Sequence, residues 1–194
     1  YDHDISSEFR VVWRGDAAST ALSSLHCDLI VAGHPKPKEL PDAWTGERLL
    51  LATGAPVLVV PSAWGDGSIG KTVMIAWNGS REIRRAIADA MPFIATALRV
   101  IVLVVGDPRK DEGAEEGATE AVQHLTRHGV NAELVVIAAD RAAVRDVIAS
   151  SAKEHEADLL VIGAYSRPRH AEMLFGGTTR SLLAAPDLPI LISR

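Results

Sequence analysis

Residues that could bind an anion are concentrated near the end of the chain. Gly163 and Ser166 are followed, after nine residues, by Gly176 and Gly177, and Thr178 comes next. Free amides at the start of a helix bind anions, and hydroxyl side chains add hydrogen-bond donors. A glycine at the end of a strand lets a base or ribose approach the backbone closely. The segment predicts a phosphate site, although a plain turn with Thr178 as an N-cap accounts for the same residues.

The elements that must position these residues alternate regularly from Lys71 onward. Short apolar runs predict strands at Lys71–Ala76, Leu98–Val105, Asn131–Ala138, Asp158–Gly163 and Leu188–Ser193. The amphipathic segments between them predict helices at Ile83–Ile94, Ala118–His128, Arg141–His155 and Gly176–Ala185. Such alternation predicts an α/β fold with a doubly wound, open parallel sheet. Ligands bind at the carboxyl ends of such strands, here the loops after Ala76, Val105 and Gly163.

The first of these helices carries a start signal and an interruption. Ser80 stands where its hydroxyl can accept the unpaired amides of the first turn, so we expect it to cap the helix. Pro92 falls inside the apolar pattern and is expected to kink the helix or divide it.

Part of the pattern occurs twice. Asp28–Gly33 (DLIVAG) matches Asp158–Gly163 (DLLVIG), and Pro56–Val59 matches Pro189–Ile192. Further upstream, Arg10-Val11-Val12 resembles Leu134-Val135-Val136. Three matches in one order make chance a poor explanation.

The repeat suggests a tandem organisation in which the first copy is incomplete. We expect residues 1–61 to be the C-terminal half of a degenerate first unit, 62–69 a linker, and 70–194 a complete second unit. The remainder of the first unit would precede Tyr1. Trp44 stands near the place that the glycine pair occupies in the second copy, so the first unit is expected to be structural.

Composition narrows the classes of protein that the chain can represent. Among 194 residues, 20 are Lys or Arg and 25 are Asp or Glu, so the net charge is −5. An acidic chain without a basic cluster lacks the charge pattern of proteins that bind nucleic acids or anionic membranes. Its longest apolar run, Val100–Val105, is far shorter than the roughly 20 residues of a membrane span. We therefore expect no nucleic-acid or membrane partner and a cytoplasmic location.

Other candidate sites have simpler explanations. Cys27 is the single cysteine, which excludes a multi-cysteine zinc site, and is expected to pack as a small hydrophobe. His124 and His128 have the spacing of metal ligands on a helix, but they fall opposite its apolar face and are expected to be solvated. We expect no resident metal. No residue pair requires a catalytic role, so no catalytic residue is assigned.

At residues 70–194 the sequence resembles the universal stress protein family, in its tandem two-domain form. Nucleotide-binding members carry G-x-x-G, nine residues, then G-[S/T], which Gly163, Ser166, Gly176 and Gly177 follow in register. Ala76-Trp77-Asn78-Gly79-Ser80 resembles the family's turn after the first strand. Asn78 stands at the family's acidic position, Ser166 at its second glycine, and Gly177 at its hydroxyl position, which Thr178 follows.

The resemblance implies a fold and a set of binding residues. The fold would be Rossmann-like, of the adenine nucleotide alpha hydrolase-like type, with parallel five-stranded sheets of order 3-2-1-4-5. Base and ribose would contact Ala76, Asn78, Val105, Ile162 and Gly163. Phosphates would contact Ser166, Gly176, Gly177 and Thr178. The edge strands Val57–Val60 and Leu188–Ser193 would pair the two repeats with each other, and a homodimer is possible.

The implied function is a stress-response sensor or regulator that binds ATP or a related adenine nucleotide, with Mg²⁺ if the nucleotide carries it. It would not be an enzyme beyond weak ATP hydrolysis. The alternative is a stress protein of the same fold that binds no nucleotide and acts as a protein-interaction module.

Overall fold

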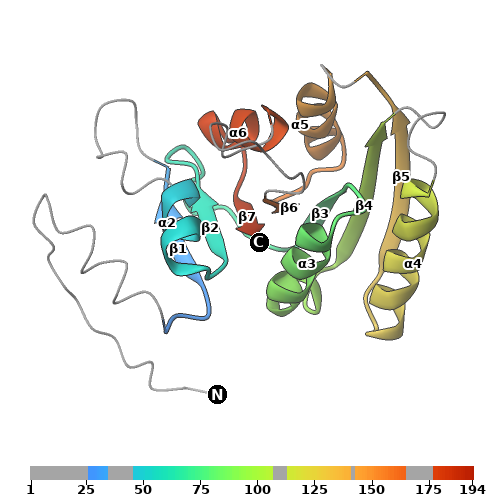
Figure 1. The fold of residues 1–194 in the computed structure, drawn as a ribbon, viewed down its shortest axis with the longest axis horizontal. Coiled ribbons are helices and arrows are strands. Elements are labelled where there is room, and N and C mark those ends of the chain that lie inside the picture. The colour runs from blue at the N-terminus through green and yellow to red at the C-terminus, as the bar shows by residue number, and fades with distance from the viewer. Residues whose placement is uncertain (1–25, 35–45, 107–112, 141–142, 165–176) are drawn as a thin grey trace, which may run out of the picture.

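The computed structural model describes residues 26–34, 46–106, 113–140, 143–164 and 177–194. The strands are β1 (Ile30–Gly33), β2 (Val57–Val60), β3 (Thr72–Trp77), β4 (Arg99–Gly106), β5 (Ala132–Ala138), β6 (Leu159–Gly163) and β7 (Ile190–Ser193). The helices are α2 (Gly46–Thr53), α3 (Arg81–Ile94), α4 (Ala114–Arg127), α5 (Val144–Glu154) and α6 (Gly177–Ala184). Strands and helices alternate from β3 onward, as the apolar pattern predicts (Figure 1).

All described strands belong to one sheet of seven strands, with the order β1-β2-β7-β6-β3-β4-β5. The expectation of separate five-stranded sheets is therefore wrong. Five strands come from residues 70–194, and their order, β5-β4-β3-β6-β7, is the expected 3-2-1-4-5. These five are parallel to one another.

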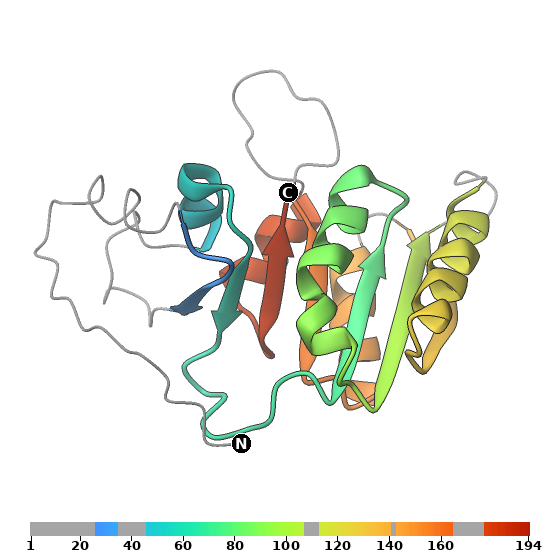
Figure 2. The ribbon, with the colours of Figure 1, turned by 90° about the horizontal axis from the view of Figure 1, so that it is seen from below.

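The sheet continues past β7 because β2 pairs with it. The two strands are antiparallel, with Val57 opposite Ile192, Leu58 opposite Leu191 and Val59 opposite Ile190. β1 then pairs parallel to β2 and forms one end of the sheet (Figure 2). An apolar edge at β7 is thereby covered by a strand from the first part of the chain.

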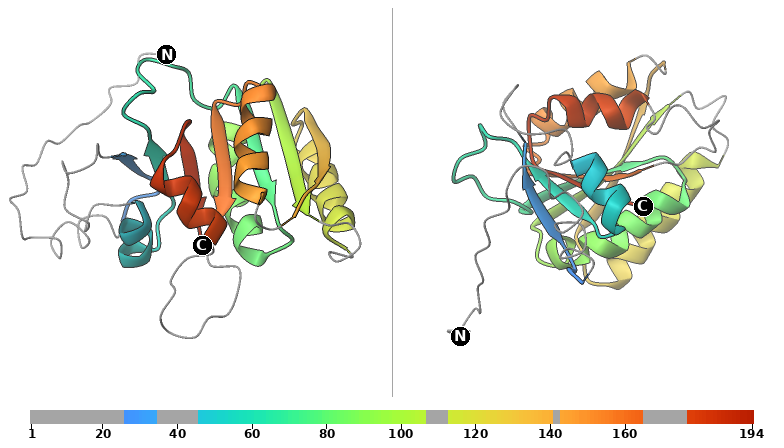
Figure 3. Two further views of the ribbon diagram at one scale, coloured as in Figure 1. Left: turned by 90° about the horizontal axis from the view of Figure 1, so that it is seen from above. Right: turned by 60° about the vertical axis from the view of Figure 1, so that its left-hand side comes forward.

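Helices cover both faces of the sheet and enclose two apolar cores. Side chains of α3 and α4 pack on one face with Val73, Ile75 and Leu191. Those of α2, α5 and α6 pack on the other face with Met74 and Ile192. Figure 3 shows α5 and α6 on the face opposite α3 and α4. Adjacent residues of one strand thus serve different cores, because side chains alternate across a sheet.

Several local expectations are corrected. α3 runs unbroken through Pro92, which lies in its last turn. α4 begins at Ala114, four residues before the predicted start at Ala118. Cys27 is exposed and does not pack in a core. The segment matched to β5, Arg10–Val12, lies outside the described residues.

The buried Asp158 carboxylate, which directly precedes β6, forms hydrogen bonds with the backbone at the start of β3. Asp158 accepts hydrogen bonds from the backbone amides of Gly70, Lys71 and Thr72 at 3.0, 3.1 and 2.9 Å. The hydroxyl of Ser68 donates to the same carboxylate at 3.0 Å. Because Asp158 is only 7% exposed, these partners replace the water that an ionised carboxylate needs. The end of the expected linker is therefore held against the second unit.

No helix among the described residues is long and apolar enough to cross a membrane.

Candidate functional site

The chain changes direction at the carboxyl ends of β3 and β6, which are neighbours in the sheet. β3 leads into α3 on one face, and β6 leads towards α6 on the other, as their packing shows through Ile83 and Leu182. In open α/β sheets, neighbouring strands whose connections leave on opposite faces mark the place where ligands bind. The candidate site is this edge of the sheet.

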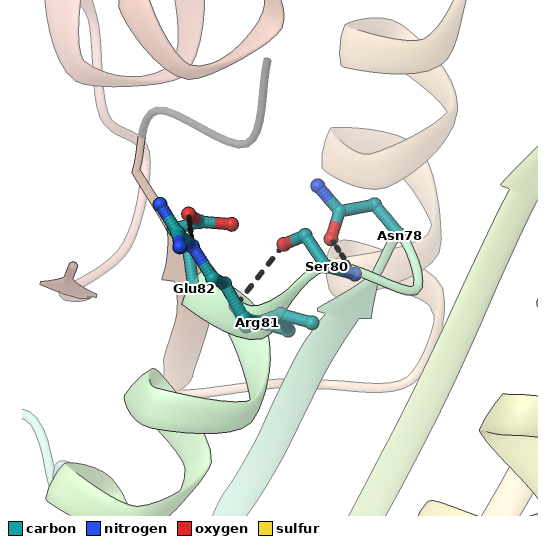
Figure 4. A network of polar contacts seen from close by, with 5 residues as sticks. Asn78, Ser80, Arg81 and Glu82 are labelled. Carbon is teal, nitrogen blue, oxygen red and sulfur yellow. Dashed lines mark hydrogen bonds and ion pairs between the residues drawn. The ribbon is translucent and has the colours of Figure 1, made fainter. Parts of the chain in front are cut away.

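The turn after β3 is held by two local hydrogen bonds (Figure 4). The Asn78 side-chain oxygen accepts from the Ser80 amide at 3.2 Å, and the Ser80 hydroxyl oxygen accepts from the Ile83 amide at 3.2 Å. Ser80 is therefore the N-cap of α3, as predicted. Gly79 has a φ of 69°, which L side chains rarely adopt, and glycine removes that strain. The exposed Asn78 is thus placed at the rim of the site by the shape of the turn.

A carboxylate that the sequence reasoning did not single out lies beside this turn. Glu82 is 7% exposed, and its carboxylate accepts from the Arg81 side-chain Nε at 2.8 Å. Burial acts to raise the pKa of Glu82, but hydrogen bonds from Arg81, the backbone and Ser80, together with the Arg81 charge, outweigh it and hold the pKa below its usual value. The sequence signal was an acidic residue in the first turn of a capped helix, where it favours the helix dipole.

Gly163 packs closely against the backbone at the start of α3. A Cβ atom at this position would lie 2.5 Å from the Ile83 amide nitrogen and 2.7 Å from the Glu82 carbonyl carbon. Both atoms belong to the backbone, which cannot turn aside as a side chain can. The glycine at the end of β6 is thus required by the packing of α3, independently of any ligand.

Trp77, the last residue of β3, contacts the start of α4. Its indole nitrogen donates to the Ala114 carbonyl at 3.1 Å, and a Cβ on Gly117 would lie 3.4 Å from the ring. The ring therefore joins the end of β3 to the first turns of α4, through a contact that the sequence reasoning did not anticipate.

The remaining candidates are distributed over the same edge. Ala76 and Val105 are partly buried near the ends of β3 and β4, and Ile162 is buried in β6. α6 begins at Gly177, followed by the partly buried Thr178. Ser166 and Gly176 lie outside the described residues. The structure thus brings the described candidates to one end of the sheet.

Metal binding finds no support in the parts of the chain that the structure describes, where no group of three or more potential ligands occurs. His124 on α4 and His128, the C-cap residue of that helix, are both exposed, with ring centroids 4.7 Å apart.

Comparison with known proteins places this geometry in a family. The model of the universal stress protein family matches residues 70–194, which hold β3 to β7 and the candidate site. The chain belongs to the universal stress protein family. The match covers a single family domain, so the tandem form stays a prediction. A universal stress protein of Synechocystis is 27% identical over 151 residues, which are 76% of this chain and 50% of that protein. The chain thus spans about half the length of this curated relative.

Solved structures agree on the universal stress protein fold. A universal stress protein from Archaeoglobus fulgidus superposes with a TM-score of 0.67 at 14% identity, over 92% of this chain and 64% of that one. The universal stress protein UspA from Lactobacillus plantarum gives a TM-score of 0.52 at 17% identity, over 66% of this chain and 100% of that one. The first match extends over both parts of the sheet, whereas the second has the extent of one family domain.

Proposed function

We propose that residues 70–194 bind ATP or a related adenine nucleotide at the carboxyl ends of β3, β4 and β6. The protein would act as a tandem universal stress protein, a sensor or regulator in the stress response and not an enzyme. The observation that carries the proposal is the position of the candidate residues at the point where β3 and β6 send their connections to opposite faces.

Three features of the edge suit a nucleotide. The Asn78 side chain, at the family's acidic position, lies at the rim and offers an acceptor and donors to a base or ribose. Ala76 and Val105 lie one residue before the ends of the neighbouring strands β3 and β4, so their backbone is close to the same rim. The start of α6, with Thr178 in its first turn, adds amides of the kind that bind phosphates, next to the segment that holds Gly176.

Thermal unfolding with Mg-ATP tests this proposal. Ligand at 100 times its dissociation constant stabilises a protein by about 2.7 kcal/mol. We expect the melting temperature of the 194-residue chain to rise with millimolar Mg-ATP and to respond less to Mg-GTP. Adenine nucleotide released on denaturing the purified protein would support the same conclusion. No shift with any adenine nucleotide would refute nucleotide binding.

A pair of variants locates the effect. Gly176→Asp places a carboxylate where the phosphates are proposed to lie, so it should abolish the shift. Gln123→Asp adds the same charge at an exposed position on α4 and should leave the shift unchanged. Equal shifts in both variants would place any bound nucleotide elsewhere.

The second candidate function is a protein-interaction module that binds no nucleotide. The close contact between Gly163 and the first turn of α3 favours it, because this glycine is then explained without a ligand. A chain that shows no shift with nucleotide yet retains the fold would support this second function.

A further inference from the structure

The residues proposed above to contact a nucleotide carry no charge of their own. A nucleotide brings several negative charges, and the chain is itself acidic, with a net charge of −5. Arginine is the side chain best matched to phosphate, because its planar guanidinium can contact two phosphate oxygens at once. An arginine from outside that set of residues would therefore add most to phosphate binding.

Arg81 places a cation at this end of the sheet. It is the first residue of α3 and directly follows the N-cap Ser80, so it lies next to the turn that carries Asn78 (Figure 4). The start of α3 packs against the end of β6, where the connections of β3 and β6 leave on opposite faces. The Arg81 side chain is 93% exposed, so its charge is open to a ligand at this rim.

The Arg81 guanidinium is held by one of its three nitrogens. Nε donates to the Glu82 carboxylate at 2.8 Å, as Figure 4 shows. The two terminal nitrogens have no partner among the described residues. They carry four of the five N–H donors of an arginine, and both can face one phosphate group. The side chain is thus anchored while the edge that binds phosphates stays available.

Glu82 can anchor the arginine because its carboxylate is buried and ionised. Burial acts to raise the pKa of Glu82, but hydrogen bonds from Arg81, the backbone and Ser80 outweigh it and hold the pKa below its usual value. The Glu82 backbone is itself fixed against β6, since a Cβ on Gly163 would lie 2.7 Å from the Glu82 carbonyl carbon. The exposed Arg81 is therefore attached to a part of the chain that is closely packed.

Two other arginines of α3 lack this combination. Arg85 uses two nitrogens to bind Asp89, with Nε 3.0 Å and a terminal nitrogen 2.9 Å from the carboxylate oxygens, so its paired donors are occupied. Arg84 is exposed, and its side chain has no partner among the described residues that would hold it in place. Arg81 is both anchored and open, which distinguishes it from these neighbours.

We propose that Arg81 is a phosphate-binding residue of the nucleotide site and that Glu82 is its positioning residue, holding Nε so that the two terminal nitrogens contact the phosphates. The proposal rests on the proposed function for the base and ribose, but its own chemistry is that of a phosphate chain. It also gives the buried Glu82 carboxylate a purpose, because the ion pair with Arg81 carries its charge to the rim.

Isothermal titration calorimetry with adenosine, ATP and tripolyphosphate tests the proposal. Arg81→Gln should weaken the binding of ATP and tripolyphosphate by about 10-fold or more, the size of one hydrogen bond between charged groups, and leave adenosine binding unchanged. Arg84→Gln removes the same charge one turn further along α3 and should change none of the affinities. Equal ATP affinity in wild type and Arg81→Gln would overturn the proposal. So would an equal loss in Arg84→Gln, because the general charge of the helix would then explain it.

The positioning role of Glu82 is tested in the same assay. Glu82→Gln keeps the size of the side chain but removes the charge that holds Arg81, so ATP affinity should fall while adenosine affinity stays the same. Combining it with Arg81→Gln should cause no further loss, because Glu82 acts only through Arg81. Additive losses, or an equal loss of adenosine binding, would overturn the positioning role. Circular dichroism verifies that each variant is folded.

The three ligands separate failure of this proposal from failure of the proposed function. If tripolyphosphate binding depends on Arg81 but ATP binds no more tightly than tripolyphosphate and adenosine does not bind, the phosphate site stands and the adenine-nucleotide function fails. If ATP binds and Arg81→Gln has no effect, the nucleotide function stands and the assignment of Arg81 fails. A folded chain that binds none of the three ligands would overturn both.

Discussion

Replacing Gly163 by alanine tests whether this glycine serves the packing of α3. The added Cβ would lie 2.5 Å from the Ile83 amide nitrogen, whereas ordinary van der Waals contact begins at 3.4 Å. The start of α3 must therefore move by about 0.9 Å relative to β6, the difference between these two distances. Forcing an extra carbon into a packed interior costs about 1–3 kcal/mol. We expect Gly163→Ala to lower the free energy of unfolding by about 2 kcal/mol.

The repeat offers a matched control for this substitution. Gly33 ends the equivalent strand, and nothing lies within 4 Å of the Cβ position there, so Gly33→Ala should change stability by less than about 0.5 kcal/mol. Urea denaturation followed by circular dichroism measures both variants. With a slope of about 2 kcal/mol per molar urea, the midpoint of Gly163→Ala should fall by about 1 M. A Gly163→Ala protein as stable as Gly33→Ala would refute the packing argument and leave a ligand as the reason for the glycine.

Three further predictions concern buried or paired carboxylates, and urea denaturation checks each one. Asp158→Ala should destabilise the fold by about 2–4 kcal/mol, because it leaves buried amides unpaired, whereas Asp28→Ala, at the exposed counterpart, should be nearly neutral. The lowered pKa of Glu82 contributes stability that is present above the ordinary carboxylate pKa and is lost as the pH falls through the lowered value, so Glu82→Gln should flatten the loss of stability between about pH 5 and 3. An unchanged pH profile would contradict that assignment. Asp89→Ala should cost about 1–3 kcal/mol, because Asp89 joins α3 to the hydroxyl of the buried Ser193 in β7; no loss would show that this contact is unimportant.

Much of the fold was predictable because it depends on local patterns. The near-continuous apolar runs identified β3 to β7, and the alternation with amphipathic segments predicted a parallel sheet. Ser80 was recognisable as a cap because the hydrogen bond it makes spans three residues. The start of α4 and the effect of Pro92 on α3 were predicted wrongly. Both depend on where a helix ends, which is set by contacts such as that of Trp77 with Ala114.

The candidate site was only partly predictable. That Ala76, Val105 and Ile162 lie close to one another follows from the strand order, and this order came from the family resemblance. Glu82 was missed because its burial depends on what packs around the start of α3. For Gly163, the sequence reasoning expected an approaching ligand, whereas the structure places the backbone of α3 there.

The sequence by itself determined the helices and strands, their alternation and the internal repeat, because each depends on the order and spacing of apolar side chains along the chain. Only the tertiary structure decided that β2 and β7 join both parts into one seven-stranded sheet. It also decided that matching residues have different surroundings, since Val161 is buried and Val31 is exposed. The physical reason is that burial depends on which segments pack against a residue, and these lie far away along the chain. Near-identical strands therefore become a core strand beside α3 and, at β1, the end of the sheet formed by the described strands.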